Sequence, residues 1–196
     1  MAWFMTRGGG TYDLHTGDRK RRLLSELEGV LVEIGSGTGP NLRYVPAEVV
    51  VIGVEPNPFM HPHFLRESQA RNGRSYLIRG SAEALPFPDE SVETVLSTLV
   101  LCSVGGLDGA LREIHRILKP GGRFIFLEHV GAPRGSWLRR FQRWVKPVWS
   151  AVGDGCEPDR DTEDNLLRAG FREVTLDRFS LPIPLVSPHI SGIARK

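Results

Sequence analysis

Short runs of apolar, often β-branched residues recur along the chain and predict buried strands. Near-continuous apolar runs of this kind are typical of parallel strands that helices cover on both faces of a sheet. The predicted strands are residues 30–34, 49–54, 75–79, 92–104 (a strand running into an apolar loop) and 123–127.

Helical spacing of apolar residues is clearest between the fourth and fifth of these strands. Leu107, Leu111, Ile114 and Leu118 recur at i, i+4, i+7 and i+11, which predicts a helix packed on the sheet. The KPGG sequence at 119–122 is predicted to end this helix. A short helix is also predicted from Thr162, as its cap, to Gly170.

The N-terminal segment is glycine-rich, and residues 1–17 are predicted to be irregular at first. The basic residues 19–22 then lead into Leu23, Leu24 and Leu27, which predicts an amphipathic helix ahead of the first strand. The basic cluster is interpreted as a solvated helix face, with contact to phospholipid or an anionic partner as the alternative.

Two further strands, 173–179 and 189–194, flank a proline-rich connector near the end of the chain. They predict an antiparallel hairpin that completes a seven-stranded, mostly parallel sheet. The fold class is therefore α/β. We expect a single domain over 1–196, with 1–28 as an N-terminal cap helix and 130–160 as an insertion on the substrate side.

Basic residues are interspersed among aromatic residues over 136–150. Core packing is the favoured interpretation of this aromatic stripe. A lid over an apolar substrate and an interfacial membrane helix remain alternatives. The stripe consists of Trp137, Phe141, Trp144, Val148 and Trp149.

Composition and charge narrow the class of protein. The chain has 40% hydrophobic and 24% charged residues and a net charge of +2, too mild to indicate a nucleic-acid partner. Cys102 and Cys156 show neither metal-ligand nor disulfide-framework spacing, so no metal site is predicted. Free thiols and the absence of a signal-peptide pattern favour a cytoplasmic location. No apolar run approaches the roughly 20 residues that span a bilayer.

A glycine-rich sequence, EIGSGTGPN, follows the first strand. The third glycine comes one residue earlier than in the G-x-G-x-x-G dinucleotide pattern. Glu33 precedes the loop, where a carboxylate suits a cationic ammonium group and repels a pyrophosphate. The E-x-G-x-G-x-G pattern resembles the first motif of class I S-adenosylmethionine methyltransferases, and the alternative is a turn without a ligand. The residues assigned to cofactor binding here are Glu33, Gly35, Ser36, Gly37, Gly39 and Asn41.

The ends of the other strands supply the remaining cofactor candidates. Glu55 follows Glu33 by 22 positions, near the spacing of the acidic residue that binds ribose hydroxyls in doubly wound folds; an exposed charge is the alternative. Tyr12 is placed over the cofactor, and Thr98 and Leu99 beside the methyl group. The remaining assignments are Pro56 and Asn57 in the ribose loop, and Ala82 and Glu83 beside the adenine.

Four residues are candidates for taking a proton from the acceptor or positioning it: Cys102, His129, Asp154 and His189. His129 is the first choice, because a neutral imidazole accepts a proton near pH 7. The alternative for each is a structural role, and Cys102 is interpreted as a small apolar wall residue.

From about residue 20 onward the chain resembles the methyltransferase-like alkyl thiol S-methyltransferases. The matching sequences are EIGSGTGPN, EPNP, TLVLCSV, LKPGG, EHV, GSW, GDGC and PHISGIARK. The resemblance implies a Rossmann-like class I methyltransferase fold and methyl transfer from S-adenosylmethionine to a small lipophilic thiol. Animal members carry a hydrophobic N-terminal anchor, which we expect this protein to lack, and they usually have Asp where this chain has Glu55.

Alternatives to thiol methylation stay open. They are a small-molecule N, O or C acceptor such as an amine, phenol or quinol, a non-catalytic S-adenosylmethionine-binding partner protein, and, more weakly, a nicotinamide oxidoreductase. The expected partner is a small lipophilic substrate and no nucleic acid, with possible peripheral membrane contact. The chain is expected to be a monomer or a homodimer.

Overall fold

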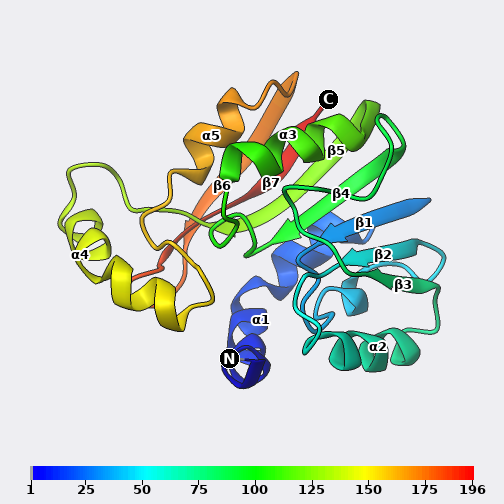
Figure 1. Ribbon diagram of the computed structural model, residues 1–196, viewed down its shortest axis with the longest axis horizontal. Coiled ribbons are helices and arrows are strands. Elements are labelled where there is room, and N and C mark those ends of the chain that lie inside the picture. Colours follow the sequence, from blue (N-terminus) through cyan, green and yellow to red (C-terminus); the bar gives the residue numbers. More distant parts are fainter. Residues whose placement is uncertain (1) are drawn as a thin grey trace.

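A single seven-stranded sheet with the strand order β3-β2-β1-β4-β5-β7-β6 forms the centre of the molecule (Figure 1). The computed structural model describes residues 2–196, with side chains from Tyr12 onward. The first five strands are mutually parallel, and β7 runs antiparallel to both of its neighbours, β5 and β6. The predicted α/β sheet with its C-terminal hairpin is therefore confirmed. The strands are β1 Val30–Ile34, β2 Val50–Val54, β3 Ser75–Ile78, β4 Val92–Thr98, β5 Leu118–His129, β6 Glu173–Ser180 and β7 Pro188–Arg195.

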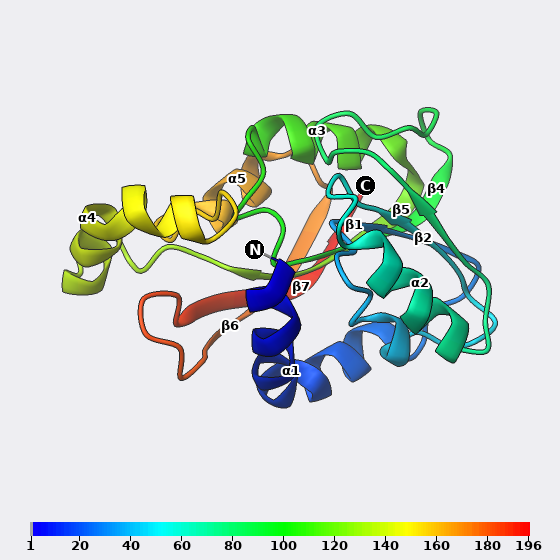
Figure 2. The ribbon, with the colours of Figure 1, turned by 60° about the horizontal axis from the view of Figure 1, so that its bottom comes forward.

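Helices cover both faces of the sheet. Figure 2 shows α3 (Leu107–Ile117) and α5 (Thr162–Arg168) on one face, and α1 (Ala2–Leu24) and α2 (His61–Ala70) on the other. Successive residues of β1 serve the two sides, since Leu31 packs in the α1–α2 core and Val32 in the α3 core. Burial on both faces is the physical reason for the continuous apolar runs in the sequence.

The carboxyl ends of the parallel strands meet at one edge of the sheet, which is where ligands bind in open α/β folds. β7 runs the opposite way and therefore begins at this edge, where His189 pairs with His129 of β5. Helix α4 (Trp137–Val152) projects from the body of the molecule on the side of β6 and β7 (Figures 1 and 2).

The N-terminal segment differs from the prediction. Residues 2–24 form one helix, α1, instead of an irregular stretch that becomes helical near Arg19. Met1 lies outside the described residues. Glycine disfavours a helix by about 1 kcal/mol per residue, and tertiary contacts overcome this preference from Tyr12 onward. Asp13 accepts a hydrogen bond from Tyr44, outside the helix, and pairs with Lys20 within it.

Two predicted helix boundaries also need correction. The KPGG sequence does end α3, but residues 119–122 belong to β5, whose register with β4 shifts between Val92 and Thr94. Backbone bonds between Gly121, Gly122 and Lys196 hold this extension in the sheet. Thr162 is the first residue of α5 and not its cap; Asp161 takes the cap position.

The core-packing interpretation of the aromatic stripe is wrong for most of its residues. Trp137 is 75% exposed, Trp144 78% and Val148 71%. The buried face of α4 instead carries Arg139 and Gln142, whose side chains bond to Ala132, Asp161 and Leu185. Among the described residues, no helix is both long and apolar enough to cross a membrane.

Candidate active site

A cavity of about 380 Å³ opens at the carboxyl edge of the sheet. Its walls come from the glycine loop after β1, the ends of β4 and β5, the start of β7, and α4 with the turn that follows it. Eleven of the predicted site residues line it: Tyr12, Glu33, Gly35, Ser36, Gly37, Asn41, Thr98, Leu99, Cys102, His129 and His189.

The glycine loop begins with a residue that cannot carry a side chain. Gly35 has a φ of +57°, and a Cβ atom there would lie 2.4 Å from Cγ2 of Val100. The loop therefore passes directly against the segment that follows β4. This approach brings the loop backbone to the cavity and places it beside the acidic residue at the end of β1.

Glu33 is 2% exposed, and its carboxylate lies in the cavity wall. Asn41 donates to Glu33 Oε1 at 2.7 Å and to Thr98 Oγ1 at 3.1 Å. Burial raises the pKa of Glu33 to about 7, although the Asn41 hydrogen bond and the charge of Lys20 act in the opposite direction. No described residue bonds to Glu33 Oε2, Asn41 Oδ1 or Ser36 Oγ.

These unpaired acceptors belong to three residues that line one cavity, and they fit the donors of the ammonium group of S-adenosylmethionine. The same group of acceptors would suit a phosphate poorly, since the Glu33 carboxylate would repel it. Glu33, Ser36 and Asn41 would hold the amino-acid end of the cofactor.

Lys20 is a cavity residue that the sequence analysis missed. It was assigned to a solvated basic face, yet it is 4% exposed and lies 2.8 Å from Asp13. Tyr44 donates to the other oxygen of Asp13 at 2.5 Å. Tyr12 and Lys20 of α1 both form part of the cavity wall. The position of Tyr12 over the cofactor stays a prediction.

The predicted ribose and adenine residues lie outside the walls of this cavity. Glu55 accepts hydrogen bonds from Gly37 N at 2.9 Å and from Asn57 N at 2.8 Å, which ties the glycine loop to the loop after β2. Glu83 accepts from Gly105 N at 2.8 Å. Ribose and adenine binding stay predictions. The predicted cofactor residues that do not line the cavity are Gly39, Glu55, Pro56, Asn57, Ala82 and Glu83.

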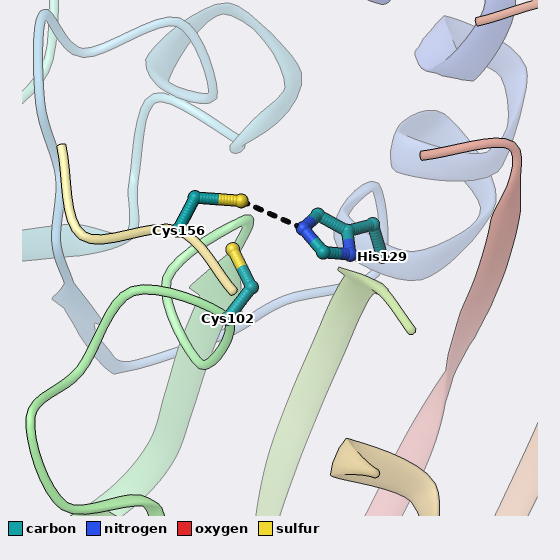
Figure 3. Close-up of side chains that lie close together, drawn as sticks. All are labelled: Cys102, His129 and Cys156. Atoms are coloured by element: carbon teal, nitrogen blue, oxygen red, sulfur yellow. Dashed lines mark hydrogen bonds between the residues drawn. The ribbon is translucent and has the colours of Figure 1, made fainter. Parts of the chain in front are cut away.

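Three of the four predicted acceptor-side residues, Cys102, His129 and His189, line the other end of the cavity. Cys156, which was not among the four, lies there as well. Nε2 of His129 lies 2.9 Å from Sγ of Cys156 (Figure 3). Cys102 faces the same point, and the two sulfur atoms and a ring nitrogen of His129 lie within 4.8 Å of one another. Asp154 does not line the cavity; it lies in the turn, with a φ of +54°, that places Cys156 there. Within the GDGC sequence, Cys156 lines the cavity and Asp154 does not, and a role of Asp154 stays a prediction.

Comparison with known proteins decides the family. A family model described as a methyltransferase domain matches residues 32–126. Thiol S-methyltransferase TMT1B of Homo sapiens is 36% identical over 192 residues, which cover 91% of this chain and 78% of the relative. Thiol S-methyltransferase TMT1A of Homo sapiens is 35% identical over 208 residues, 99% of this chain and 85% of the relative. The chain belongs to the thiol S-methyltransferase family.

Solved structures agree on the fold of this methyltransferase. An S-adenosylmethionine-dependent methyltransferase of Thermotoga maritima, described as a possible histamine N-methyltransferase, superimposes with a TM-score of 0.65 at 26% identity and full coverage of both chains. The [4+2]-cyclase SpnF gives a TM-score of 0.73 at 20% identity over 91% of this chain and 78% of its own. The protein is a class I methyltransferase that uses S-adenosylmethionine, as predicted.

Burial and hydrogen bonding set the protonation of the acceptor end in this methyltransferase. A hydrogen bond with Cys102 and further ones with His129 and Trp149 lower the pKa of Cys156, against the effect of burial. The same pairing, together with burial, raises the pKa of Cys102. Burial lowers the pKa of His189 to about 4, so its imidazole is neutral at pH 7. Nδ1 of His189 lies 2.9 Å from the Ser187 carbonyl, which makes Nδ1 the donor and leaves Nε2 as an acceptor.

Glu128 shapes the loop that carries Cys102. It is fully buried at the end of β5 and accepts hydrogen bonds from the Ser97 hydroxyl, from Val100 N at 3.2 Å and from Leu101 N at 3.1 Å. Burial raises the pKa of Glu128 to about 7, and these donors oppose the shift. The carboxylate thereby fixes the start of the loop whose next residue faces the cavity.

Proposed function

We propose that the protein transfers the methyl group of S-adenosylmethionine to the sulfur of a small, lipophilic thiol. The observation that supports this most directly is the acceptor end of the cavity, where Leu99, Trp149, Ile183 and Val186 provide apolar walls around a small cluster of sulfur and imidazole groups. Human relatives that share about a third of the sequence are named thiol S-methyltransferases.

Positioning accounts for most of the catalysis in this proposal. S-adenosylmethionine, when bound, supplies an activated methyl group. Glu33, Asn41 and Ser36 hold its amino-acid end, and the apolar walls hold the acceptor on the opposite side of the methyl carbon. Alignment of reacting groups of this kind contributes about 7–11 kcal/mol.

The cavity offers the acceptor a neutral imidazole, that of His189, instead of a strong base. A thiol with a pKa of about 8.5 is already a few per cent thiolate at neutral pH, so it needs less help than a phenol with a pKa of about 10. Burial lowers the pKa of His189 to about 4, so its Nε2 can accept a hydrogen bond from the thiol, and the proton itself passes to solvent. His129, the first choice from the sequence, has its Nε2 engaged by Cys156.

A single incubation with S-adenosylmethionine and a panel of thiols, phenols, amines and quinols, read by mass spectrometry, tests this function. We expect thioethers from the alkyl thiols and no methylated product from the other classes. Methylated amine or quinol with untouched thiols would show that the acceptor assignment is wrong. Tight S-adenosylmethionine binding without turnover of any acceptor would favour a non-catalytic partner protein.

We further infer that the exposed face of α4 contacts a lipid surface. Trp137, Phe141, Trp144 and Val148 lie along this outer face, and Arg140 and Arg143 are exposed beside them. The same helix contributes Trp149 to the cavity wall. Aromatic and basic residues in this arrangement suit an interfacial helix, and a lipophilic acceptor dissolved in the membrane would reach the cavity along α4. A cytoplasmic location and the absence of a nucleic-acid partner remain parts of this proposal.

Liposome co-sedimentation tests the membrane contact. Replacing Trp137 and Trp144 by Ser removes two large side chains, each worth about 1.5–3 kcal/mol when taken out of water. We expect binding to anionic vesicles to fall at least tenfold, or ~1.4 kcal/mol. Phe59→Ser is the control, because Phe59 is equally exposed but lies apart from α4. Unchanged vesicle binding, with a dimer that dissociates in the double variant, would assign this face to a second copy of the chain.

A further inference from the structure

Three metal-ligating side chains from distant parts of the chain converge at the acceptor end of the cavity. Cys102 lies in the loop after β4, His129 ends β5, and Cys156 lies in the turn after α4. All three are buried, and all three line the cavity. Figure 3 shows both sulfur atoms and Nε2 of His129 facing a common point, with ligand atoms within 4.8 Å of one another.

Two thiolates and one imidazole are a donor set that zinc prefers, and a catalytic zinc site keeps its fourth position open. Zn–S bonds of about 2.3 Å and Zn–N bonds of about 2.0 Å place tetrahedral ligand atoms roughly 3.5–3.8 Å apart. The pair of His129 Nε2 and Cys156 Sγ, now at 2.9 Å, needs to open by only a fraction of an ångström to admit the ion. The open position would then face the cavity.

A neighbouring donor fits a metal-bound sulfur. Nε1 of Trp149 donates to Cys156 Sγ at 3.3 Å, which would orient this ligand and stabilise its thiolate. Glu128 holds the loop of Cys102 through the backbone N–H groups of Val100 and Leu101. Both thiol ligands are thus held by their surroundings, as a preorganised site requires.

We propose that Cys102, His129 and Cys156 bind a zinc ion whose fourth coordination position takes the sulfur of the acceptor thiol. This inference rests on the proposed function for the identity of the fourth ligand, and on the geometry alone for the metal. It goes beyond positioning, because a metal ion activates a bound thiol by favouring its deprotonated form.

Methyl transfer at such a site would consist of deprotonation of the acceptor thiol followed by displacement at the methyl carbon. The acceptor thiol loses its proton to solvent when its sulfur binds the ion. A sulfur lone pair attacks the methyl carbon and forms the new C–S bond. The bond between that carbon and the sulfonium sulfur breaks, and its electron pair leaves neutral S-adenosylhomocysteine. The thioether product carries no negative charge, so it binds the ion weakly and departs.

Cobalt substitution and metal analysis test the site directly. The chain has 2 cysteines, so a thiolate-to-cobalt charge-transfer band can come from no other pair. We expect one equivalent of Zn²⁺ per chain in protein purified without chelator, and a two-thiolate band in the Co²⁺ form. Hexanethiol without S-adenosylmethionine should strengthen this band, as a third sulfur binds, and hexanol should leave it unchanged.

Matched variants separate ligands from neighbours. Cys102→Ser, Cys156→Ser and His129→Gln should each weaken Zn²⁺ binding by more than the roughly 10–100-fold typical of outer-shell changes. His189→Gln and His115→Gln should retain the full equivalent, because neither residue belongs to the cluster. S-adenosylmethionine binding at the Glu33 end, measured by calorimetry, shows that each variant is folded.

The outcomes distinguish this inference from the proposed function. Metal-free protein that cannot be reconstituted, or Zn²⁺ retained in all three ligand variants, would overturn the metal site. A Cys102–Cys156 disulfide in the native protein would overturn it as well. Thiol methylation at an undiminished rate after complete metal removal would overturn the activating role and leave the proposed function intact. Stoichiometric zinc with no spectral response to any thiol would remove the acceptor from the fourth position.

Discussion

Replacing Glu33 by Gln weakens S-adenosylmethionine binding about 10–100-fold at pH 8. The substitution keeps the shape of the side chain and removes the negative charge that faces the cavity. A hydrogen bond to a charged group contributes about 1.5–3 kcal/mol, which corresponds to this loss of affinity. Isothermal titration calorimetry with S-adenosylmethionine measures the effect, and Glu67→Gln on α2 is a control outside the cavity.

The same residue predicts how binding depends on pH. Burial raises the pKa of Glu33 to about 7 in the free protein. Above pH 7 the carboxylate is ready for the cofactor's ammonium group. Below pH 7 the carboxyl must first lose a proton, so we expect the affinity to fall toward about tenfold per pH unit. The Glu33→Gln variant should show no such slope between pH 5.5 and 8, and a slope that persists in it would assign the titration to another group.

Replacing Gly35 by Ala disrupts the glycine loop and is expected to abolish cofactor binding. The φ of +57° costs a residue with a Cβ about 1–2 kcal/mol. The new Cβ would also lie 2.4 Å from Val100 Cγ2, and overpacking of this kind costs about 1–3 kcal/mol. The loop must therefore move, together with the backbone that surrounds Glu33 and Ser36.

Two further variants separate strain from the clash. Gly121→Ala has a comparable φ of +77°, but its Cβ would meet no atom within 4 Å, so it should lose only about 1 kcal/mol of stability and bind the cofactor normally. Val100→Ala combined with Gly35→Ala removes the nearest clashing atoms and should restore part of the binding. Gly35→Ala with unchanged affinity would show that the close approach is not required. Thermal unfolding and calorimetry supply both readouts.

The sheet was predictable from the sequence because its strands are buried on both faces. Runs such as 30–34 and 123–127 can satisfy their apolar side chains only between two layers of helices. The glycine loop was equally clear, since Gly35 and Glu33 fill roles that few other residues could take. Neither inference required knowledge of distant contacts.

The rest of the site depends on contacts between residues far apart in the chain. Cys156 meets Cys102 and His129 only because α4 and the turn after it return to the edge of the sheet. Lys20 lines the cavity on α1, and its partner Asp13 accepts a hydrogen bond from Tyr44, 31 residues further along the chain. The aromatic stripe of α4 has helical spacing in either setting, so its periodicity could not distinguish core packing from exposure.

Methyl transfer to sulfur is the central claim, and one competition experiment tests it most directly. Equal concentrations of hexanethiol, hexanol and hexylamine share the same apolar chain and differ only in the accepting atom. Incubated together with the protein and trideuteromethyl-labelled S-adenosylmethionine, they should give labelled methyl hexyl thioether as the sole product detected by mass spectrometry. Label on oxygen or nitrogen, with hexanethiol recovered unchanged, would contradict the account.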